Sequence, residues 1–454
     1  MTTGQKVSLA AKLSLPAILA QFSSIFMQYI DASMVGSLGA APSASIGIVS
    51  TTIWLFGGLL VACSSGFSVQ VAHLVGANDF EGARNVFRQG ITMTLIFSSL
   101  LMLVGCSISP YLPALLGGGT DIQADASLYF LIFALCLPFL QIEILAAGVL
   151  RCSGNLFVPS MLNAMMCIFD IIFNFFFIFP SADYQVLGLT VHCPGAGLGV
   201  AGAALGTATA ELLTAVLMMY FAAFKSKEMR LTETKGRFMP TMRVIRKALH
   251  IGMPMGCERG IMCGAQIMST AIVAPLGTFA LAANTLSITA ESLCYMPGYG
   301  IGEAATTLVG QSIGAKRRDL TWSFSKITLA MGMLVMTLMG LIMFVFAPEM
   351  IGFMSPVEEV RQLGTMALRI EAFAEPMFAA SIVCYSIFIG SGDTLVPSMM
   401  NLGSIWAVRI SLAALLAPLY GLNGVWIAMA VELTFRGSIF LIRLFRKKWL
   451  RKVV

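Results

Sequence analysis

Carboxyl and amide side chains inside long apolar stretches are the residues of this sequence best suited to chemistry. One such stretch begins near Leu13 and ends in QYIDASMVGSLG (28–39), which contains Asp31. A later stretch, CIFDIIFNFFFIF, contains Asp170 and Asn174, which are four residues apart and so share one face of a helix. A carboxylate one turn from an amide oxygen can form part of a Na⁺ site or can hold a hydrogen-bonded proton. The alternative is a single polar contact between two helices.

The acids of the apolar stretches differ between the two halves of the chain. Four lie in the first half, with no Lys or Arg in the same stretches: Asp31, Glu143, Asp170 and Glu211. A charge at the centre of a membrane helix costs about 2.5–3.5 kcal/mol on insertion scales. If the stretches span a membrane, these carboxyls must therefore be protonated or bind a cation, as a site that exchanges H⁺ or Na⁺ would.

The second half combines acids with cations in its apolar stretches. It holds six Glu together with four arginines: Arg259, Arg369, Arg409 and Arg436. There we favour structural ion pairs, such as Glu432 with Arg436 at i and i+4 on one helix face.

The composition identifies the environment of these residues. The chain has 454 residues, of which 57% are hydrophobic and only 11% are charged, whereas a soluble domain has about 25% charged residues. Such a chain cannot cover a surface that faces water. In lipid every backbone polar group must be bonded internally, so we predict an all-α integral membrane protein.

Twelve stretches are long and apolar enough for a membrane-spanning helix of about 20 residues. They lie near residues 13–36, 45–72, 90–112, 127–149, 157–180, 198–223, 248–275, 279–304, 325–347, 365–389, 398–419 and 421–443. Of the 28 Lys and Arg residues, 23 lie at the termini or in alternate connections, eight of them in residues 225–247. The positive-inside rule then predicts a multi-pass plasma-membrane protein with both termini cytoplasmic. This sorting explains the net charge of +6, so we expect no nucleic-acid partner.

Landmarks recur along the chain at one constant offset, the separation in sequence between Pro16 and Pro254. SGNLFVPSMLN (153–163) returns at this offset as SGDTLVPSMMN (391–401). Two further proline pairs follow it: Pro110 with Pro348, and Pro138 with Pro376. Six spans in each half insert the same way up, as a parallel repeat with a substrate site expected between the halves. We predict a first lobe over 1–224, a basic cytoplasmic linker over 225–247 and a second lobe over 248–454.

The repeat shows what is particular to Asp31. Gln28 has an identical partner in Gln266, whereas the partner of Asp31 is Ser269. The halves share the framework but not the acid, so we expect Asp31 to bind the ion that drives transport. Pro16 lies about four turns before Asp31 and is the predicted hinge of this helix, because proline removes an intrahelical hydrogen bond.

An ordered set of motifs along nearly the whole chain resembles the multidrug and toxic compound extrusion (MATE) family: DASMVGSLG, GVLRCSGNLFVPSMLN, SGDTLVP and GVAGAALGT. The resemblance implies two six-helix bundles with a central cavity between them. It also implies export of organic cations and other amphipathic drugs in exchange for inward H⁺ or Na⁺.

The resemblance extends to single residues. Asp31 matches the family's aspartate in span 1, Pro16 the proline where that helix bends, and Thr207 a hydroxyl of span 6. Many relatives read N-x-x-x-D in span 5, where this chain has Asp170 and Asn174 in the exchanged order. We therefore expect H⁺ or Na⁺ to couple at Asp31, Asp170, Asn174 and Thr207, with the first three as possible Na⁺ ligands.

One branch of that family has a glutamate in the middle of span 7 and an aspartate in the middle of span 10. Here Met262 stands near the first place, and AASIVCYSIF, around the second, contains no acid. We therefore place coupling in the first half and treat Glu258 and Glu375 as secondary candidates. Together with Gln28 and Gln266 they form the predicted lining of the substrate cavity.

Two other functions stay open at this point. A flippase for a lipid-linked sugar has a related architecture, and Arg259, Arg369 and Arg409 keep it under consideration. The acids of the first half favour cationic or neutral cargo instead. A membrane-embedded enzyme would need a catalytic motif, but HExxH, GxSxG and the nucleotide loop GxxxxGK[ST] are absent from the sequence. We expect a monomeric transporter of cationic drug-like molecules in the lipid bilayer, not an enzyme, without a cofactor beyond its coupling ion.

Overall fold

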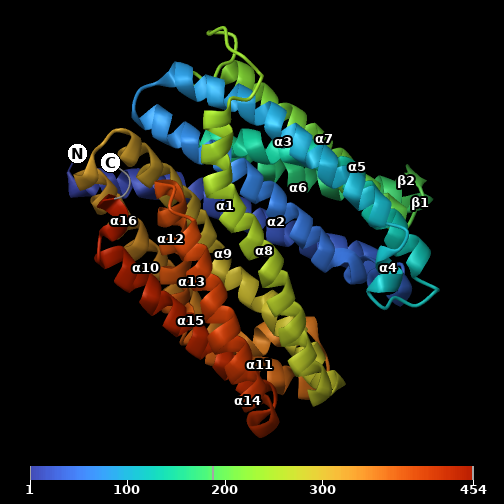
Figure 1. Ribbon diagram of the computed structural model, residues 1–454. Helices are drawn as coiled ribbons and strands as arrows, with labels where there is room; N and C mark the ends of the chain where they lie inside the picture. Colours follow the sequence, from blue (N-terminus) through green and yellow to red (C-terminus); the bar gives the residue numbers. More distant parts are fainter. Residues whose placement is uncertain (1, 187–188, 452–454) are drawn as a thin grey trace. The chain divides into compact units, whose positions relative to one another are not determined.

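The computed structural model describes residues 2–186 and 189–451, and most of them are helical (Figure 1). The helices of the first half are α1 (Thr3–Gly36), α2 (Ala40–Gly76), α3 (Phe80–Ile108), the short α4 (Leu112–Leu115), α5 (Gln123–Cys152), α6 (Phe157–Ile178) and α7 (Val200–Tyr220), which the π-helical turn η1 (Phe221–Lys225) continues. The second half begins with α8 (Met242–Val273), the 3₁₀ turn η2 (Ala274–Leu276), α9 (Thr278–Gly314) and α10 (Arg318–Met354). It continues with α11 (Glu358–Ala372), α12 (Glu375–Ser391), α13 (Leu395–Gly403), the π-helical η3 (Ser404–Ile410), α14 (Ser411–Tyr420), α15 (Leu422–Phe445) and α16 (Lys448–Arg451).

Each of the twelve predicted stretches falls on helical structure. Within the described residues, nine helical segments are long and apolar enough to cross a membrane, or ten when the bent pair α11 and α12 is counted as one span. α8 and α9 are long enough but are not among these nine. The all-α fold is therefore observed, and the number of twelve spans stays a prediction.

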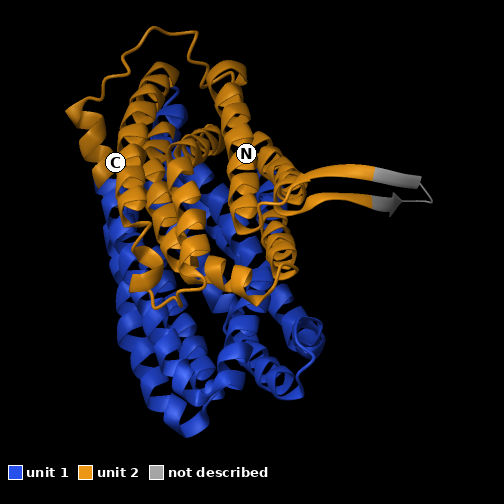
Figure 2. Cartoon of the chain, turned by 90° about the vertical axis from the view of Figure 1, so that its right-hand side faces the viewer, with its two compact units in different colours: residues 1–22, 72–79, 250–454 blue, residues 23–71, 80–249 orange. Residues whose placement is uncertain are grey.

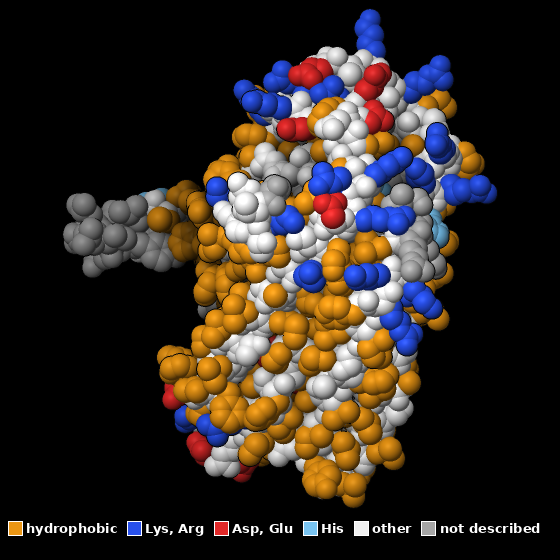
Figure 3. Space-filling view, turned by 90° about the vertical axis from the view of Figure 1, so that its left-hand side faces the viewer, with side chains coloured by type: hydrophobic (Ala, Val, Ile, Leu, Met, Phe, Trp, Pro, Cys, Tyr) orange, Lys and Arg blue, Asp and Glu red, His pale blue; other side chains and the backbone are white. Residues whose placement is uncertain are grey.

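The helices turn apolar side chains outward as well as inward, as lipid requires. On α10, Leu334, Leu338, Leu341 and Val345 recur every three or four residues, and each is more than half exposed. The opposite face of α10 is buried and includes the fully enclosed Met336. Hydrophobic side chains accordingly cover broad areas of the face drawn in Figure 3.

The backbone repeats the internal symmetry of the sequence. Gly39 precedes α2 with φ of 125°, and its repeat partner Gly277 precedes α9 with φ of 111°. Gly154 and its partner Gly392 also have positive φ, 100° and 81°. Because these conformations favour glycine, the repeat preserves the turns as well as the helices.

The connection after α6 forms a β-hairpin. Strands β1 (Pro180–Val186) and β2 (Leu189–Ala196) pair antiparallel, with Asp183 opposite His192. The His192 imidazole lies 2.6 Å from the Asp183 carboxylate, and the hairpin extends away from the helices around it (Figure 2). A segment that leaves the helices this way satisfies its backbone groups by strand pairing.

The chain forms two compact units, which Figure 2 shows in two colours. Unit 1 consists of residues 1–22, 72–79 and 250–454, and unit 2 of residues 23–71 and 80–249. The predicted lobes differ from these units in the first residues, in the end of α2 and in the linker. The lobes, which are defined by the duplication, stay a prediction.

The first part of α1 belongs to unit 1 because of its packing. Ala10 is fully buried in a cluster with Leu308 of α9 and Phe324 of α10. At the end of α2, Gly76 lies so close to the backbone of Gln311 in α9 that no Cβ fits between them. These contacts join both segments to helices of the second half.

The linker belongs to unit 2 because α3 holds it. Arg84 donates hydrogen bonds to the carbonyl oxygens of Lys227 and Glu228 and forms an ion pair with Glu233 at 2.6 Å. Arg88 donates to the carbonyl of Leu231 at 2.6 Å. Arg84 and Arg88 therefore hold the 225–247 linker against α3.

Candidate functional site

α6 places the two central polar residues of the site on one face. Its sequence is apolar almost throughout, so a polar side chain is stable there only when neighbouring helices enclose it. Asp170 is fully buried and Asn174 is 1% exposed. The Asn174 Nδ2 donates a hydrogen bond of 3.0 Å to Asp170 Oδ2. The predicted pairing at i and i+4 is therefore present.

Asp31 and Thr207 complete the predicted group. The same Nδ2 of Asn174 donates a second hydrogen bond, of 2.9 Å, to Asp31 Oδ1 of α1. The Thr207 hydroxyl of α7 and the Asp31 carboxyl both lie within hydrogen-bonding reach of the Asp170 carboxyl. All four residues belong to unit 2, so three helices distant in sequence bring together the four side chains predicted to couple an ion.

Two buried oxygens of this group are left without a partner among the described residues: Asp170 Oδ1 and Asn174 Oδ1. A buried acceptor without a donor costs about 1–3 kcal/mol. The Asn174 Nδ2 donates its two hydrogens to the two carboxyls. The Asn174 Oδ1 can therefore only accept, and it has no donor among the described residues. A proton on a carboxyl or a small cation supplies what these oxygens lack.

The two carboxyls also interact with each other. Asp31 and Asp170 lie within hydrogen-bonding reach and repel when both are ionised. Two carboxyls this close share one proton or hold a cation between them. Such an arrangement of carboxyls can exist with or without one bound positive charge.

Glycines let α6 and α7 approach closely enough to build the site. A Cβ on Gly206 would overlap the Asn174 side chain and lie 2.8 Å from its backbone nitrogen. One turn earlier, a Cβ on Gly202 would overlap the backbone of Phe177. Small residues at this spacing are the usual means of close helix packing in membranes. They occur here in GVAGAALGT, the motif that also contains Thr207.

Two further residues lie near the site: Tyr129, which sequence reasoning did not single out, and Glu211, one of the four acids of the first half. Tyr129 of α5 is an electrostatic neighbour of Asp31, Asp170 and Glu211. Glu211 lies one turn after Thr207 on α7. Nothing in the spacing of the apolar residues distinguishes Tyr129 from other aromatic residues, because its position depends on how α5 packs against α7.

Comparison with known proteins identifies the family. The profile of the MatE family matches residues 16–176 and again residues 254–415. The chain belongs to the MATE family. The two matches start at Pro16 and Pro254, the pair that defines the repeat offset, so the family profile finds the same duplication as the internal repeat.

Relatives of the MATE chain match it over almost their full length. It is 23% identical over 449 residues to "Probable multidrug resistance protein NorM" of Thermotoga maritima, covering 98% of this chain and 93% of that protein. It is 24% identical over 455 residues to "Multidrug resistance protein MdtK" of Yersinia pestis, covering 97% and 94%.

Solved structures of transporters have the same fold. The Vibrio cholerae MATE transporter VcmN in the bent form has a TM-score of 0.87 at 20% sequence identity, over 99% of this chain and 98% of that one. A MOP superfamily transporter from Pyrococcus furiosus, described as having a binding pocket of reverse polarity, has a TM-score of 0.88 at 18% identity, over 97% and 96%.

One acid of the first half has a cation among its electrostatic neighbours. Glu143 of α5 is an electrostatic neighbour of Arg151, two turns later on the same helix. The predicted spans place Arg151 in the cytoplasmic connection. α5 runs on to Cys152, so that Arg151 lies in the last turn of this helix.

Glu258, a secondary candidate in this MATE chain, is 6% exposed and is held by two donors in unit 1. The Tyr385 hydroxyl donates to one carboxylate oxygen at 2.5 Å, and Asn401 Nδ2 donates to the other at 2.8 Å. Both partners come from helices late in the chain, and the sequence alone did not indicate them. Both oxygens of Glu258 therefore already accept a hydrogen bond in this structure.

The other three residues of the predicted substrate lining lie in different surroundings. Gln28 of α1 and Gln266 of α8 are exposed. Glu375 is fully buried inside unit 1 and faces no open surface in this structure. Pro16, the predicted hinge, lies within a helix that continues without interruption from Thr3 to Gly36.

The arginines of the second half mostly form the structural contacts expected for them. Arg436 and Arg409 each lie 2.9 Å from a carboxylate oxygen of Glu432. Arg369 lies over the Phe344 ring at 5.5 Å and donates to the Phe344 carbonyl oxygen at 3.3 Å. The predicted pair of Glu432 with Arg436 is confirmed, and Arg409 joins it.

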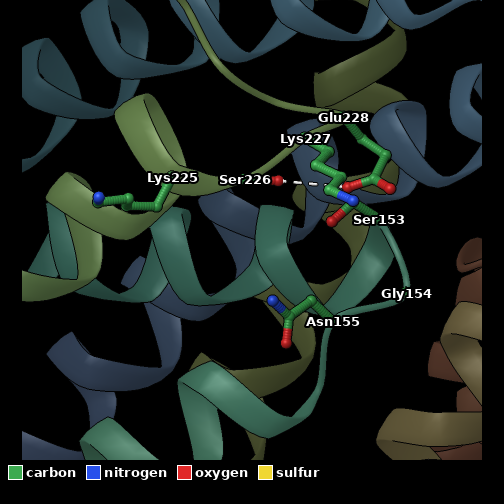
Figure 4. A pocket seen from close by; sticks show the side chains of 7 residues that line it. All are labelled: Ser153, Gly154, Asn155, Lys225, Ser226, Lys227 and Glu228. Atoms are coloured by element: carbon green, nitrogen blue, oxygen red, sulfur yellow. Dashed lines mark hydrogen bonds between the residues drawn. The ribbon is translucent and has the colours of Figure 1, made fainter.

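A separate cavity of about 360 Å³ lies beside the loop between α5 and α6. Its lining, drawn in Figure 4, consists of Ser153, Gly154, Asn155, Lys225, Ser226, Lys227 and Glu228. The Lys225 side chain points away from the rest, and Ser226 donates to Glu228 at 3.5 Å (Figure 4). The cavity contains none of the predicted coupling residues, so we assign it no part in coupling.

Proposed function

We propose that this protein is a secondary active antiporter that exports organic-cation or amphipathic drugs in exchange for inward H⁺ or Na⁺ by alternating access. Membership of the MATE family supports export in general. The names of the Thermotoga maritima and Yersinia pestis relatives, both described as multidrug resistance proteins, support drugs as the cargo.

One observation carries the coupling part of the proposal. Asn174 binds Asp31 and Asp170 at the same time, and two buried oxygens beside them have no partner among the described residues. An ion that enters supplies the missing positive charge and stabilises α1 against α6. When the ion leaves, the carboxyls repel, and the helices separate or accept another cation. A cationic drug and the coupling ion thus compete for one negative charge in successive steps of the cycle.

The flippase alternative finds less support in the second half than the arginine count first suggested. Arg409 is paired with Glu432, and Arg369 is engaged by Phe344. A pyrophosphate group would need guanidinium groups free to bind it bidentately. Among the arginines named for this role, Arg259 alone is exposed, so we retain drug export.

We place the protein in the plasma membrane as a monomer, with both termini and the 225–247 linker in the cytoplasm. The basic residues of the linker support this orientation, since positive residues beside membrane helices stay on the cytoplasmic side. The hairpin of β1 and β2 then lies on the outer side, because one span separates it from the cytoplasmic loop that precedes α6.

Drug uptake into inverted membrane vesicles tests the proposal and identifies the ion. Ethidium uptake is measured under an imposed H⁺ gradient and, separately, under an imposed Na⁺ gradient. We expect uptake with one of the two gradients and expect the same gradient to fail with Asp31→Asn. Absence of uptake with either gradient, in vesicles that contain folded protein, would reject ion-coupled export of this class of drug.

A further inference from the structure

The bend between α11 and α12 brings buried acids together in unit 1. The two helices meet at 60° with a break at residues 373–374, and both are labelled in Figure 1. Glu371 is the second-last residue of α11, and Glu375 is the first residue of α12. Broken membrane helices are a usual place for ion sites in transporters.

These two carboxyls are enclosed without any partner. Glu371 and Glu375 are each 0% exposed. All four of their carboxyl oxygens lack a hydrogen-bond partner within the part of the chain that the structure describes. α10 lies against them at Gly340, where an added Cβ would come within 3.0 Å of the Glu375 Cβ. A carboxylate in such surroundings is unstable, whereas a protonated carboxyl is tolerated.

The charges that surround the two acids lead to the same conclusion. Glu371 is an electrostatic neighbour of Glu291 on α9, of Glu432 on α15 and of Arg409 on η3. Arg436 of α15 is the other cation of the cluster. α9 contributes two further groups, Cys294 and Tyr295, which are neutral.

The remaining helix packed against the bend, α10, is described over its whole length and contributes no ionisable side chain to the cluster. Four carboxyls thus face two guanidinium groups. Glu432 is bound to both arginines, at 2.9 Å each. Its single negative charge balances one of the two guanidinium groups, so the other guanidinium balances one more ionised carboxyl. Two carboxyls remain that must hold protons for the buried cluster to be neutral.

The whole cluster is particular to the second half of the chain. At the repeat offset, Glu371 and Glu375 correspond to the apolar Phe133 and Leu137 of α5. α5 continues unbroken through the proline that follows Leu137, although Pro376 follows Glu375 in the same way. Both the acids and the break are therefore additions to one half, as Asp31 is an addition to the other.

We propose that unit 1 has a proton-binding site of its own at this bend, in which Glu371 and Glu375 hold protons in the present state and release at least one during the transport cycle. The release of a proton during transport rests on the proposed function, whereas the protonation of the two carboxyls does not. Each carboxyl keeps its proton while the bend encloses it, and loses the proton to water when a change of the bend angle exposes it. Loss of the proton leaves a carboxylate and a hydronium ion, so charge is balanced.

Infrared spectroscopy of the purified full-length protein tests the protonation without any transport. The carbonyl band of protonated carboxyls is recorded near neutral pH in an Asp31→Asn, Asp170→Asn background, which removes the site of unit 2 from the signal. We expect the band to weaken with Glu371→Gln and again with Glu375→Gln. The control Glu349→Gln changes an exposed acid of α10 and should leave the band unchanged.

Two results would overturn the protonation. One is a band that neither Gln variant weakens, and the other is a band that disappears on adding NaCl at constant pH, which would indicate a sodium site. Glu375→Leu introduces the residue of the first half and serves as a second variant if Glu375→Gln does not fold. It should weaken the band to the same extent.

Release is tested by counting protons per ethidium bound in weakly buffered detergent solution. In protein with an intact unit 2, we expect the Glu371→Gln, Glu375→Gln double variant to release at least one proton fewer than the unchanged chain. Equal release would reject the exchange at the bend. If the unchanged chain neither binds ethidium nor exports it, drug export is rejected, while the infrared result still stands for the bend.

Discussion

Asn174 of α6 donates a hydrogen bond to Asp31 of α1 at 2.9 Å, across 143 residues of chain. The same nitrogen binds Asp170, one turn away on α6. One amide thus links a carboxyl of the first span to a carboxyl of the fifth predicted span. The ionic state of either acid therefore influences the other and the packing of the two helices.

Removal of the Asp31 charge should stop coupling and leave the fold intact. Asp31→Asn keeps the size of the side chain and a hydrogen-bonding group for Asn174, but it can neither take up a proton nor neutralise a cation. We expect gradient-driven ethidium uptake into inverted vesicles to fall at least about tenfold, or about 1.4 kcal/mol. The control is Asp125→Asn, an exposed acid in the first turn of α5. Full uptake by Asp31→Asn would remove Asp31 from the mechanism.

The order of acid and amide in α6 should matter less than the presence of both. Asp170→Asn alone leaves Asp31 as the one acid of the trio, and we expect uptake to fall at least about tenfold. The double exchange Asp170→Asn, Asn174→Asp restores one acid and one amide, one turn apart on the same face. We expect it to regain most of the lost uptake. If the double variant is as inactive as Asp170→Asn alone, the position of the acid is itself essential.

The close approach of α6 and α7 should be required for the site. Gly206→Ala introduces a Cβ that overlaps Asn174, so α7 must move away or Asn174 must leave its two carboxyls. We expect lower uptake together with a lower melting temperature in detergent. Gly57→Ala in α2 is the matched control, because nothing lies within 4 Å of its added Cβ. Equal behaviour of the two variants would show that the site adapts to a wider spacing.

The ion cluster of unit 1 should contribute strongly to stability. Glu432 is fully buried and bound to Arg409 and Arg436. Glu432→Gln leaves the buried Arg436 and the partly buried Arg409 short of an anion, and loss of one partner of a buried pair costs about 3–5 kcal/mol. The measurement is the melting temperature of the purified protein, which we expect to fall clearly.

The control for this variant is a surface ion pair. Glu358→Gln removes the partner of Arg361, 3.5 Å away on an exposed helix face. An exposed pair contributes about 0–1 kcal/mol, so the melting temperature should hardly change. A similar small effect of Glu432→Gln would mean that another acid of the cluster replaces Glu432.

The sequence predicted the features that depend on local pattern. Apolar length places the helices, because lipid leaves the backbone no other way to satisfy its hydrogen bonds. The spacing of four residues predicted that Asp170 and Asn174 share a face, and the structure confirms it. The rarity of charge in the spans pointed to Asp31, which does join that pair.

Features that depend on the packing of distant helices could not be read in this way. Tyr385 and Asn401 bind Glu258 from segments more than 120 residues away, and no periodicity relates them. The break at residues 373–374 also escaped prediction. Pro138 and Pro376 have the same place in the repeat, yet only the second follows a broken helix, so proline alone does not decide the bend.

α1 is built from the first repeat but is shared between two folded bodies. Its residues up to Phe22 belong to the body formed by the second repeat, where Ala10 packs with Leu308 and Phe324. A gene chimaera joined at the 225–247 connection would therefore pair one parent's Ala10 with another parent's α9 and α10. A crossover after Phe22 as well as after Leu249 would keep the Ala10 contacts within one parent, whereas the contact of Gly76 with Gln311 would still join two parents. The boundaries of the duplicated sequence repeats therefore differ from the boundaries of the two folded units.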